Sequence, residues 1–398
     1  MQIDTHAQLP VRASEAAAIA EIAQFVGASG LEVYLVGGAV RDLILGRPLT
    51  DVDLAVDGDP GQLAAEIGAP SSAETRFGTL SVERNGFRYD LARTRSERYP
   101  RPGALPAVAP AGIDADLARR DFSVNAIALG LAGSRAGELL SAPEALADLA
   151  ARQLAVLHDA SLIDDPTRLL RLARYAARLG FEPAPHTREL AAAAIAGNAL
   201  ATISGTRIGN ELRLLATEPD PVAAFDAVAA LGLPWAIDAP LARAALAVLP
   251  EDGRRDLLVL ACVLNTAKPP YEQLLAELER LGFTASDRDV IAEAAAAAEL
   301  ARRLVGSDRG SQIAHAVGTS GIETVALASG QGAASQALAW LRDLRHRTLE
   351  ITGDDLIQHG LSQGPGIGEA LTAARSALMD GTATNREAQL RVALESAE

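Results

Sequence analysis

Two patterns of hydrophobic and polar positions divide the chain. Up to about residue 95, short apolar runs are broken by turn residues: a helical pattern at 15–28 precedes two predicted strands, LEVYLVGG (31–38) and DVDLAV (51–56). Two more runs, GTLSVER and FRYDLAR, flank Asn85-Gly86, the strongest short-range hairpin signal. This part therefore predicts a small mixed α/β domain.

Beyond about residue 115, helical spacing dominates and strand signals nearly vanish. The composition there is rich in Ala and Leu, which favour helices. Segments containing Pro and Gly predict breaks between helices near 218–221, 249–253, 268–270 and 330–335. The two patterns together predict an α+β fold, with a small mixed sheet at the N-terminus followed by an all-α region.

A proline-rich segment separates the two patterns. YPRPGALPAVAPAG, at 99–112, contains four prolines, so we predict no regular structure there. We expect an irregular loop that joins two parts of one site.

Composition limits the class of protein. A chain of 398 residues with 49% hydrophobic and 22% charged residues is long enough for two to four domains and is typical of a soluble globular protein. It shows no apolar run approaching about 18 residues and no visible secretory signal, so we expect no membrane contact. The single cysteine, Cys262, excludes a disulfide or a thiolate metal site within one chain; it is expected to be buried, in a reducing cytoplasm.

The net charge of −15 argues against a protein that holds nucleic acid by general attraction. Arginine is locally concentrated, however: residues 84–120 contain eight arginines and four acids, and 168–178 contain four arginines and no acid. We therefore expect RNA contact to be confined to an arginine-lined strip facing the site, with acidic charge on the C-terminal helices.

The sequence DVD at 51–53 places two carboxylates on one face of a predicted strand. Side chains alternate along a strand, so Asp51 and Asp53 point the same way. Two such carboxylates repel unless a cation lies between them, and hard oxygen ligands suit Mg²⁺. A neighbouring strand of the predicted hairpin can bring Asp90 beside them, which gives the three carboxylates needed to hold two Mg²⁺. Two acids on a solvated edge strand are the alternative interpretation.

Gly37 and Gly38 separate the first predicted strand from a helical pattern. A glycine pair at this position lets backbone N–H groups approach a phosphate, and Arg41 in the next turn can clamp a triphosphate. A simple turn is the alternative, but the DVD sequence that follows makes the phosphate interpretation more specific.

The segment DLARRDFSVNA carries a further cluster of charged and polar residues. In a functional interpretation, Arg120 contacts a phosphate or ribose, and Asp121 and Asn125 shape a ribose pocket. A solvated capping segment is the structural alternative.

The segment IDDPTRLLRLARYAAR combines a helix start with a row of arginines. Arg168, Arg171, Arg174 and Arg178 share one face, where a triphosphate or an RNA backbone would balance their charge. Asp165 and Arg168, one turn apart, offer an acceptor beside a donor fork. Cytosine and adenine present the complementary order of groups, and guanine and uracil present the reverse, so the pair would accept C and A.

These motifs resemble the class II tRNA nucleotidyltransferases and related bacterial poly(A) polymerases, in the polymerase β nucleotidyltransferase superfamily. The resemblance runs in order through YLVGGAVRD, TDVDLAV, FRYDLARTRSERY, DLARRDFSVNAIAL, DDPTRLLRLARYAARLGF and TRIGNELRLL, and covers about the first 215 residues. It implies a nucleotidyltransferase head (1–130), a helical neck with base-recognition and RNA-binding helices (131–215), and a helical body and tail (216–398).

The resemblance also implies an activity: Mg²⁺-dependent, template-independent addition of C, C and A from CTP and ATP to the 3′ end of tRNA, in the cytoplasm. Asp51 and Asp53 would hold the metal, with Asp90 at the third carboxylate position. The residues that it assigns to the nucleotide are Gly38, Arg41 and Arg120 for general contact, Asp165 and Arg168 for reading the base, and Arg171 and Arg174 for supporting the base and its phosphates.

Departures from the family pattern keep alternatives open. Thr206 stands where Glu is common, Ala155 where Arg is frequent, and SAPEAL (141–146) where DPFGGL is usual. The PGALP sequence of the loop is similar to that of a branch in which separate CC-adding and A-adding enzymes occur. Addition of only A or only CC therefore stays open. Poly(A) polymerase and a non-catalytic RNA-binding protein also stay open. His158-Asp159 resembles a phosphohydrolase motif, but the other histidines lack the required clustering. The oligomeric state is left open.

Overall fold

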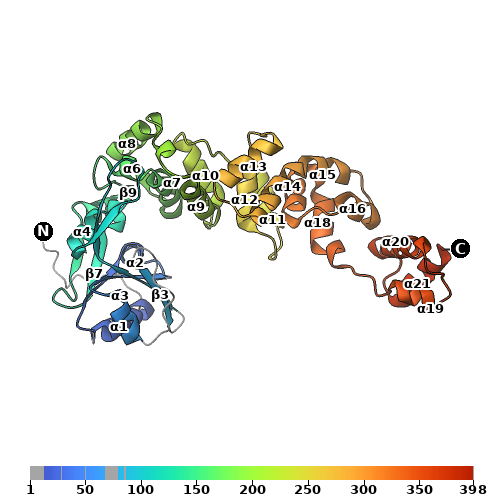
Figure 1. The fold of residues 1–398 in the computed structure, drawn as a ribbon, viewed down its shortest axis with the longest axis horizontal. Helices are drawn as coiled ribbons and strands as arrows, with labels where there is room; N and C mark the ends of the chain where they lie inside the picture. Colours follow the sequence, from blue (N-terminus) through green and yellow to red (C-terminus); the bar gives the residue numbers. More distant parts are fainter. Residues whose placement is uncertain (1–12, 28, 50, 68–78, 85–86, 398) are drawn as a thin grey trace. The chain divides into compact units, whose positions relative to one another are not determined.

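The computed structural model describes residues 13–27, 29–49, 51–67, 79–84 and 87–397. The chain forms two compact units, residues 1–203 (unit 1) and 204–398 (unit 2). Within the described residues, all strands belong to unit 1, and unit 2 is built of helices (Figure 1).

Unit 1 is built from short helices and strands. Its helices are α1 (Ala13–Gly27), α2 (Gly38–Ile44), α3 (Pro60–Ile67), α4 (Ile113–Ala118), α5 (Ala145–Ala151), α6 (Ser161–Asp164), α7 (Thr167–Leu179) and α8 (Pro185–Ala196). Its strands are β1 (Glu32–Val36), β2 (Asp51–Asp57), β3 (Thr79–Arg84), β4 (Phe87–Arg93), β5 (Arg95–Arg98), β6 (Ala107–Pro110), β7 (Ile127–Ala132), β8 (Leu139–Ser141), β9 (Gln153–Leu154) and β10 (Glu182–Pro183).

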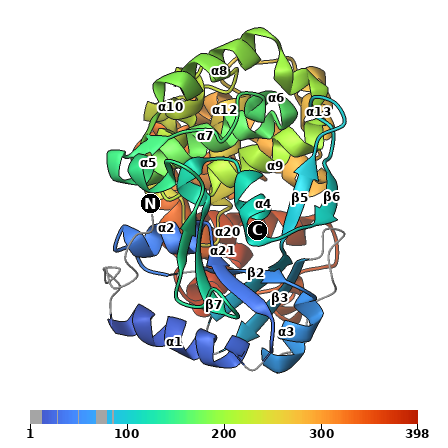
Figure 2. The same cartoon turned by 90° about the vertical axis from the view of Figure 1, so that its left-hand side faces the viewer.

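The main sheet of unit 1 has six strands in the order β3-β4-β2-β1-β7-β8. β2 and β4 are parallel, and the other neighbours are antiparallel. Residues 33–36 of the central strand β1 are all buried, which explains why this run is apolar. Helices α1 and α3 pack on each other and on the strands, below the sheet in Figure 2. The small mixed sheet confirms the predicted α+β class.

The predicted hairpin is confirmed in its two arms. β3 and β4 pair antiparallel, from Thr79 opposite Ala92 to Arg84 opposite Phe87. Asn85-Gly86, on which the prediction rested, lies outside the described residues.

The prediction that strands nearly vanish beyond residue 115 is wrong. β7 and β8 complete the main sheet, and β9 and β10 form a separate parallel pair. The sequence of β7, IALGLA, is a continuous apolar run because the strand pairs with β1 in the interior of the unit. Such a run cannot be distinguished from a buried helix by periodicity.

The prediction of no regular structure at 99–112 is also wrong. β6 pairs with β5 in a two-stranded ribbon, which Figure 2 shows beside α4. Pro110 is the last residue of this exposed strand, a position at which the sheet does not need an N–H donor. Residues 99–106 form the loop between the two strands.

Unit 2 consists of helices joined by short connections. They are α9 (Gly205–Ala216), α10 (Pro221–Ala230), α11 (Ala239–Val248), α12 (Arg255–Leu264), α13 (Tyr271–Arg280), α14 (Ala285–Glu293), α15 (Ala297–Leu304), α16 (Gly310–Val317), α17 (Ile322–Ala328), α18 (Ala334–Arg342), α19 (Gly353–Gln358), α20 (Pro365–Met379) and α21 (Arg386–Glu395).

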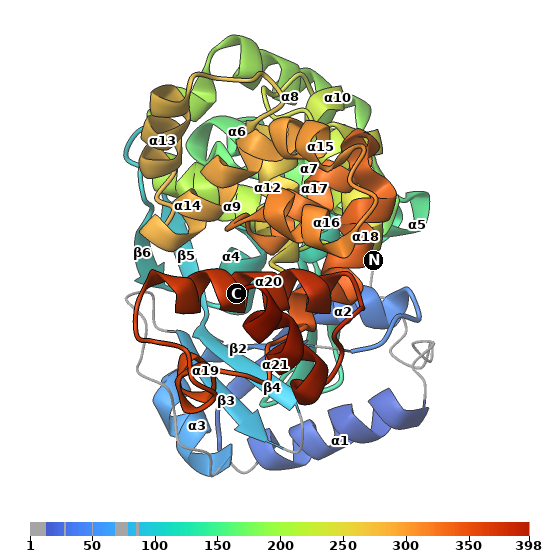
Figure 3. The same cartoon turned by 90° about the vertical axis from the view of Figure 1, so that its right-hand side faces the viewer.

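The predicted breaks in this region are confirmed. Helices end before 218–221, 249–253 and 268–270, and the segment at 330–335 contains a kink in which Gly332 has φ 105°. Helices α19, α20 and α21 enclose their own small core around Leu356, and α20 and α21 lie side by side in Figure 3. None of the helices that the structure describes combines the length and apolar character that crossing a membrane requires.

Cys262, on α12, is buried as predicted. Burial, with a smaller contribution from the charge of Asp238, raises the pKa of this thiol to about 12. The side chain therefore stays protonated at neutral pH and acts as a small apolar group.

Candidate active site

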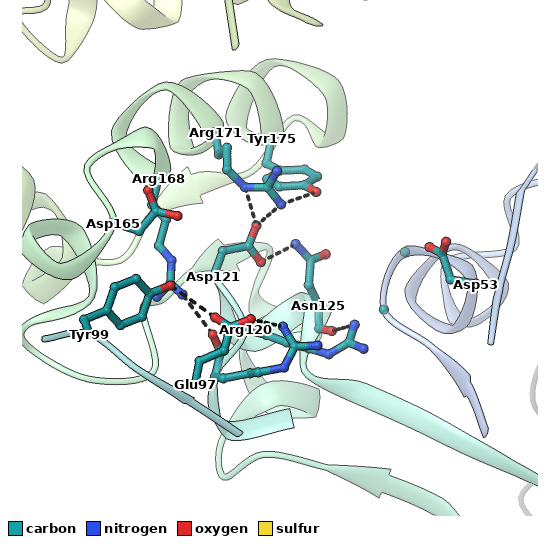
Figure 4. Close-up of a pocket in the computed structure, with 13 residues that line it drawn as sticks. Asp53, Glu97, Tyr99, Arg120, Asp121, Asn125, Asp165, Arg168, Arg171 and Tyr175 are labelled. Carbon is teal, nitrogen blue, oxygen red and sulfur yellow. Dashed lines mark hydrogen bonds and ion pairs between the residues drawn. The ribbon is translucent and has the colours of Figure 1, made fainter. Parts of the chain in front are cut away.

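A pocket of about 370 Å³ lies within unit 1 (Figure 4). Its volume falls within the range of small-molecule sites, about 300–1,000 Å³. Residues from all four predicted motifs meet there. The lining residues are Gly37, Gly38, Asp53, Glu97, Tyr99, Arg119, Arg120, Asp121, Asn125, Asp165, Arg168, Arg171 and Tyr175.

One side of the pocket carries Asp53 of the main sheet. Asp53 on β2 and Asp90 on β4 are register partners in the parallel pair, so the structure brings Asp90 beside Asp53 as expected. Asp90 accepts hydrogen bonds from the Ser81 hydroxyl and from Arg88 Nε, the latter at 3.2 Å. Asp51 begins β2, but its side chain lies outside the described residues.

The donor set at this edge fits a divalent metal ion. Carboxylates at the same level on neighbouring strands repel unless a cation lies between them, and Mg²⁺ prefers such hard oxygen ligands. Among the described side chains, no group of three or more His, Cys, Asp or Glu residues is arranged to hold a metal. Asp53 and Asp90 are two carboxylates at one level of the sheet, and the predicted set with Asp51 as a third stays a prediction.

His158-Asp159 does not form a second metal centre among the described side chains. The carboxylate of Asp159 pairs with His186 Nε2 at 2.8 Å, and both side chains are exposed. Burial, reinforced by the charge of Arg168, lowers the pKa of His158.

The glycine pair forms the predicted turn between β1 and α2. Gly37 has φ 64°, a conformation that favours glycine, and its N–H donates to the carbonyl of Ile127 at 3.0 Å. A Cβ on Gly37 would lie 2.6 Å from Arg120 Nη1. The absence of a side chain therefore lets the Arg120 guanidinium lie directly against the backbone.

Arg41 is not among the residues that line the pocket and is only 3% exposed. Its guanidinium donates to both carboxylate oxygens of Asp42, at 3.0 and 2.9 Å, and to Asn125 Oδ1. In this structure it holds Asn125 in place, and direct contact of Arg41 with a nucleotide stays a prediction.

Asp121 connects the ribose cluster to helix α7. Its carboxylate accepts from Asn125 Nδ2 at 3.0 Å and from Arg171 Nε at 2.9 Å. Burial alone would raise its pKa, but the charge of Arg171 and the hydrogen bonds from Asn125 and Arg171 outweigh burial and lower the pKa to about 2. Asp121 is therefore ionised at neutral pH, and part of the anionic charge that we predicted along the arginine face belongs to the protein itself.

Two acids outside the predicted set hold the neighbouring arginines. The buried carboxylate of Asp116 accepts from Arg119 Nη2 at 2.6 Å and from Arg120 Nη2 at 3.0 Å. Glu97 accepts from Arg119 Nη1 at 2.9 Å. Burial opposes ionisation of Asp116, but the charges of Arg120 and Arg119 prevail and hold its pKa below the usual value. Arg119 and Arg120 thus have fixed orientations in the pocket.

The proposed base-reading residues lie across the pocket from Asp53 (Figure 4). Asp165 Oδ1 accepts from the N–H of Thr167, the first residue of α7, at 3.1 Å, and Pro166, predicted as the first helical residue, is the N-cap. Arg168 Nη2 donates to the Arg119 carbonyl at 2.8 Å. The two residues therefore share one wall, as their spacing predicts.

Sequence reasoning missed Tyr99, Glu97 and Tyr175. Burial raises the pKa of Tyr99 to about 12 against the opposing charge of Arg168, so its hydroxyl is a neutral donor and bonds Glu97 at 3.1 Å. The guanidinium carbons of Arg41, Arg171 and Arg174 lie 5.6, 5.6 and 5.1 Å from the Tyr175 ring centroid. An aromatic residue within a row of arginines was the available signal for Tyr175.

The loop at 99–106 connects two walls of the pocket, as expected. The N–H of Gly103 donates to the carbonyls of Ile163 and Asp164 at 3.3 and 3.1 Å. Its φ is 70°, and a Cβ there would lie 2.1 Å from Thr202 Oγ1. The loop tip is therefore attached to α6, next to Asp165.

Comparison with known sequences gives consistent relatives. The family described as "Poly A polymerase head domain" matches residues 33–155. The A-adding tRNA nucleotidyltransferase of Halalkalibacterium halodurans is 30% identical over 92% of this chain and 88% of its own length. The A-adding enzyme of Geobacter sulfurreducens is 33% identical over 92% of this chain, and the CC-adding enzyme of Deinococcus radiodurans is 45% identical over 48%. This chain spans only 45% and 51% of the length of these last two relatives.

Solved structures agree with these relatives. A CCA-adding enzyme in its apo form II superposes with a TM-score of 0.79 at 26% identity, with 97% of each chain covered. The Thermotoga maritima CCA-adding enzyme, solved in complex with tRNA, gives a TM-score of 0.73 at 25% identity, over 98% of this chain and 97% of its own. The pocket, the sequence relatives and these folds together establish that the chain belongs to the family of tRNA nucleotidyltransferases and poly(A) polymerases.

Proposed function

We propose that this protein adds C and A residues from CTP and ATP to the 3′ end of tRNA without a nucleic-acid template. The observation that carries the proposal is one pocket with Asp53 of the sheet, the register partner of Asp90, on one side and the Asp165–Arg168 pair on the other. Family membership supports nucleotidyl transfer. A tRNA substrate makes the cytoplasm the expected compartment.

In the proposed reaction, the 3′ hydroxyl oxygen of tRNA bonds to the α-phosphorus of the nucleotide. The bond from that phosphorus to the bridging oxygen breaks, pyrophosphate leaves, and the hydroxyl proton passes to solvent. We assign Asp51, Asp53 and Asp90 as ligands of Mg²⁺, which when bound favours ionisation of the attacking hydroxyl and balances charge on the leaving pyrophosphate.

The remaining residues of the pocket would bind and orient the nucleotide. Arg120, held against Gly37 by Asp116, balances triphosphate charge. Asp121 and Asn125, already bonded to each other, face the ribose. Arg171, on α7, would support the base and phosphates from the opposite wall, and the buried Arg174, beside Tyr175, would add positive charge to that wall.

Asp165 and Arg168 would select the base. An acceptor beside a donor fork matches the amino group and ring nitrogen of cytosine or adenine. Guanine or uracil would leave buried groups without partners, which costs about 1–3 kcal/mol each. One pocket can therefore accept both C and A and reject the other two bases.

Addition of only A or only C is the second candidate. The A-adding relatives match over 92% of this chain, and a CC-adding relative has 45% identity over about half of it. Either enzyme would use the same carboxylates and the same transfer chemistry, and would differ in which nucleotide is accepted at each step.

Labelled CTP and ATP, supplied separately and together, test these candidates on tRNA transcripts that lack all three, the last two or only the final nucleotide of the CCA end. We expect both nucleotides to be added in order, followed by a stop. Incorporation of only one kind establishes the divided pathway, and long A tails on generic RNA establish a poly(A) polymerase. No incorporation by the folded protein with Mg²⁺ present contradicts the proposal.

Asp51→Ala tests the proposed metal ligands in the same assay. We expect it to keep the wild-type unfolding transition and lose nearly all incorporation. Substantial remaining activity would show that the proposed metal ligands are wrong.

A further inference from the structure

Ser161, the first residue of α6, contacts both residues of the base-reading pair from behind the pocket. Its side chain is completely buried. Its hydroxyl oxygen accepts a hydrogen bond from Arg168 Nη1. Its backbone carbonyl accepts from the Asp165 N–H at 3.2 Å. The same residue is therefore bonded to the acceptor and to the donor of the pair.

The orientation of the Arg168 guanidinium depends on two bonds. Nη1 donates to the Ser161 hydroxyl, and Nη2 donates to the Arg119 carbonyl at 2.8 Å. A guanidinium is planar, so acceptors on both terminal nitrogens fix the direction of its remaining N–H groups. Arg168 is 5% exposed, and a rotation would leave buried donors without partners.

Discrimination between bases requires such a fixed donor. The Watson–Crick edges of C and U have similar shapes and differ in where they place donors and acceptors. A guanidinium that can rotate, or that contacts the base through water, binds C and U with little difference in energy, because it can adapt to either arrangement of donors and acceptors. Rejection of the wrong base therefore depends on what holds Arg168.

We propose that Ser161 is a specificity-determining positioning residue. Its hydroxyl fixes the guanidinium of Arg168, and its carbonyl fixes the backbone N–H of Asp165. Held in this way, the pair favours C and A over U and G. The inference rests on the proposed function in one respect, namely that Asp165 and Arg168 read the base.

Ser161→Ala tests the proposal because it removes the hydroxyl and leaves the carbonyl bond to Asp165. The primary measurement is direct binding of CTP, ATP, UTP and GTP to the full chain, from which the ratio of dissociation constants for UTP and CTP is obtained. We expect this ratio to fall about tenfold, the effect of one lost buried hydrogen bond. Misincorporation of UMP into tRNA should rise by a similar factor.

Ser29→Ala is the matched control. Ser29 is also a buried serine of unit 1, and its hydroxyl donates to the Val26 carbonyl at 2.6 Å, away from the pocket. We expect this variant to keep the wild-type UTP-to-CTP ratio. Ser161→Cys fills similar space with a weak acceptor, so it should shift the ratio in the same direction and provides the test if Ser161→Ala does not fold.

An equal loss of affinity for all four nucleotides, with the ratio unchanged, would overturn the proposal and reduce Ser161 to a structural role. The result is separable from the proposed function. A chain that prefers CTP in binding but transfers nothing to tRNA contradicts the proposed function alone, and a changed ratio in Ser161→Ala would still support the positioning role.

Discussion

The two walls of the pocket place their charged residues by different means. On the sheet side, strand register sets Asp53 beside Asp90. On the helical side, buried acids hold the arginines: Asp116 bonds Arg119 across one turn at the end of α4, and Asp121 bonds Arg171 on α7. On the sheet side Asp90 pairs with the exposed Arg88, whereas on the helical side the counter-charges of the arginines are buried acids.

This difference separates the effects of substitution. Removing an acid from the sheet side should leave folding largely intact while abolishing chemistry, because the proposed role of these acids is in the reaction. Removing an acid from the helical side leaves a buried or half-buried guanidinium without its partner, which affects stability as well as binding.

The largest expected effect is on transfer by Asp53→Asn. Loss of a proposed metal ligand should reduce kcat/KM about a thousandfold, about 4 kcal/mol of transition-state stabilisation. The unfolding midpoint in urea should not fall. Asp57→Asn, at the exposed end of the same strand, is the control and should retain activity. A stable Asp53→Asn protein with near-normal turnover would remove the distinction between the two walls.

Asp116→Asn should affect both stability and binding. It removes the charge that Arg119 and Arg120 share, and we expect the free energy of unfolding to fall by about 3 kcal/mol and the KM for nucleotides to rise. The control is Asp114→Asn. Asp114 is on the same helix, its side chain is 83% exposed, and its substitution should change the free energy of unfolding by less than about 1 kcal/mol. Equal effects of the two substitutions would show that burial of Asp116 is unimportant.

The lowered pKa of Asp121 predicts that the free energy of unfolding falls at low pH. Its pKa is about 2 in the folded protein and 3.8 as the ordinary value, so its ionised form stabilises the fold above about pH 4 and this contribution is lost as pH falls through 2. The contribution is about 2 kcal/mol. Urea unfolding of wild type and Asp121→Asn between pH 2 and 6 should show curves that converge at low pH; parallel curves would contradict the assignment.

The smallest expected effect concerns Tyr175. Tyr175→Leu removes the ring shared by three guanidiniums and should destabilise unit 1 by about 1 kcal/mol. Tyr175→Phe keeps the ring and loses only a 3.4 Å contact with Arg171 Nη2, so its unfolding free energy should stay close to that of wild type. Thermal unfolding distinguishes them, and a larger loss in Tyr175→Phe would point to the hydroxyl instead.

The part of the site that could be predicted from sequence is the part that local periodicity controls. Alternation along a strand placed Asp53, and a one-turn spacing placed Asp165 with Arg168. Each of these predictions needs only the repeat of a strand or a helix. Asp90, by contrast, reaches Asp53 through the long-range parallel pairing of β2 with β4.

Glu97 meets Arg119 only through a contact between distant segments, whereas Asp116 meets Arg119 and Arg120 within one helical turn and Ser161 meets Arg168 seven positions away. Arg168 meets the Arg119 carbonyl 49 positions away, and Arg171 meets Asp121 50 positions away. No local pattern encodes such pairings. The strands β6 and β7 were missed for a related reason, because their pairing partners decide their structure more than their own composition does.

The central place of β1 in the sheet matters to the newly made chain. Val36 pairs with Ala128 on β7, which leaves the ribosome much later than β1 does. Until β7 emerges, an apolar strand has one open edge, available for pairing with other nascent chains. Slow translation between the codons of β1 and β7 should therefore promote aggregation. Slow translation after Tyr175 should be tolerated, because the last pocket residue has then been synthesised.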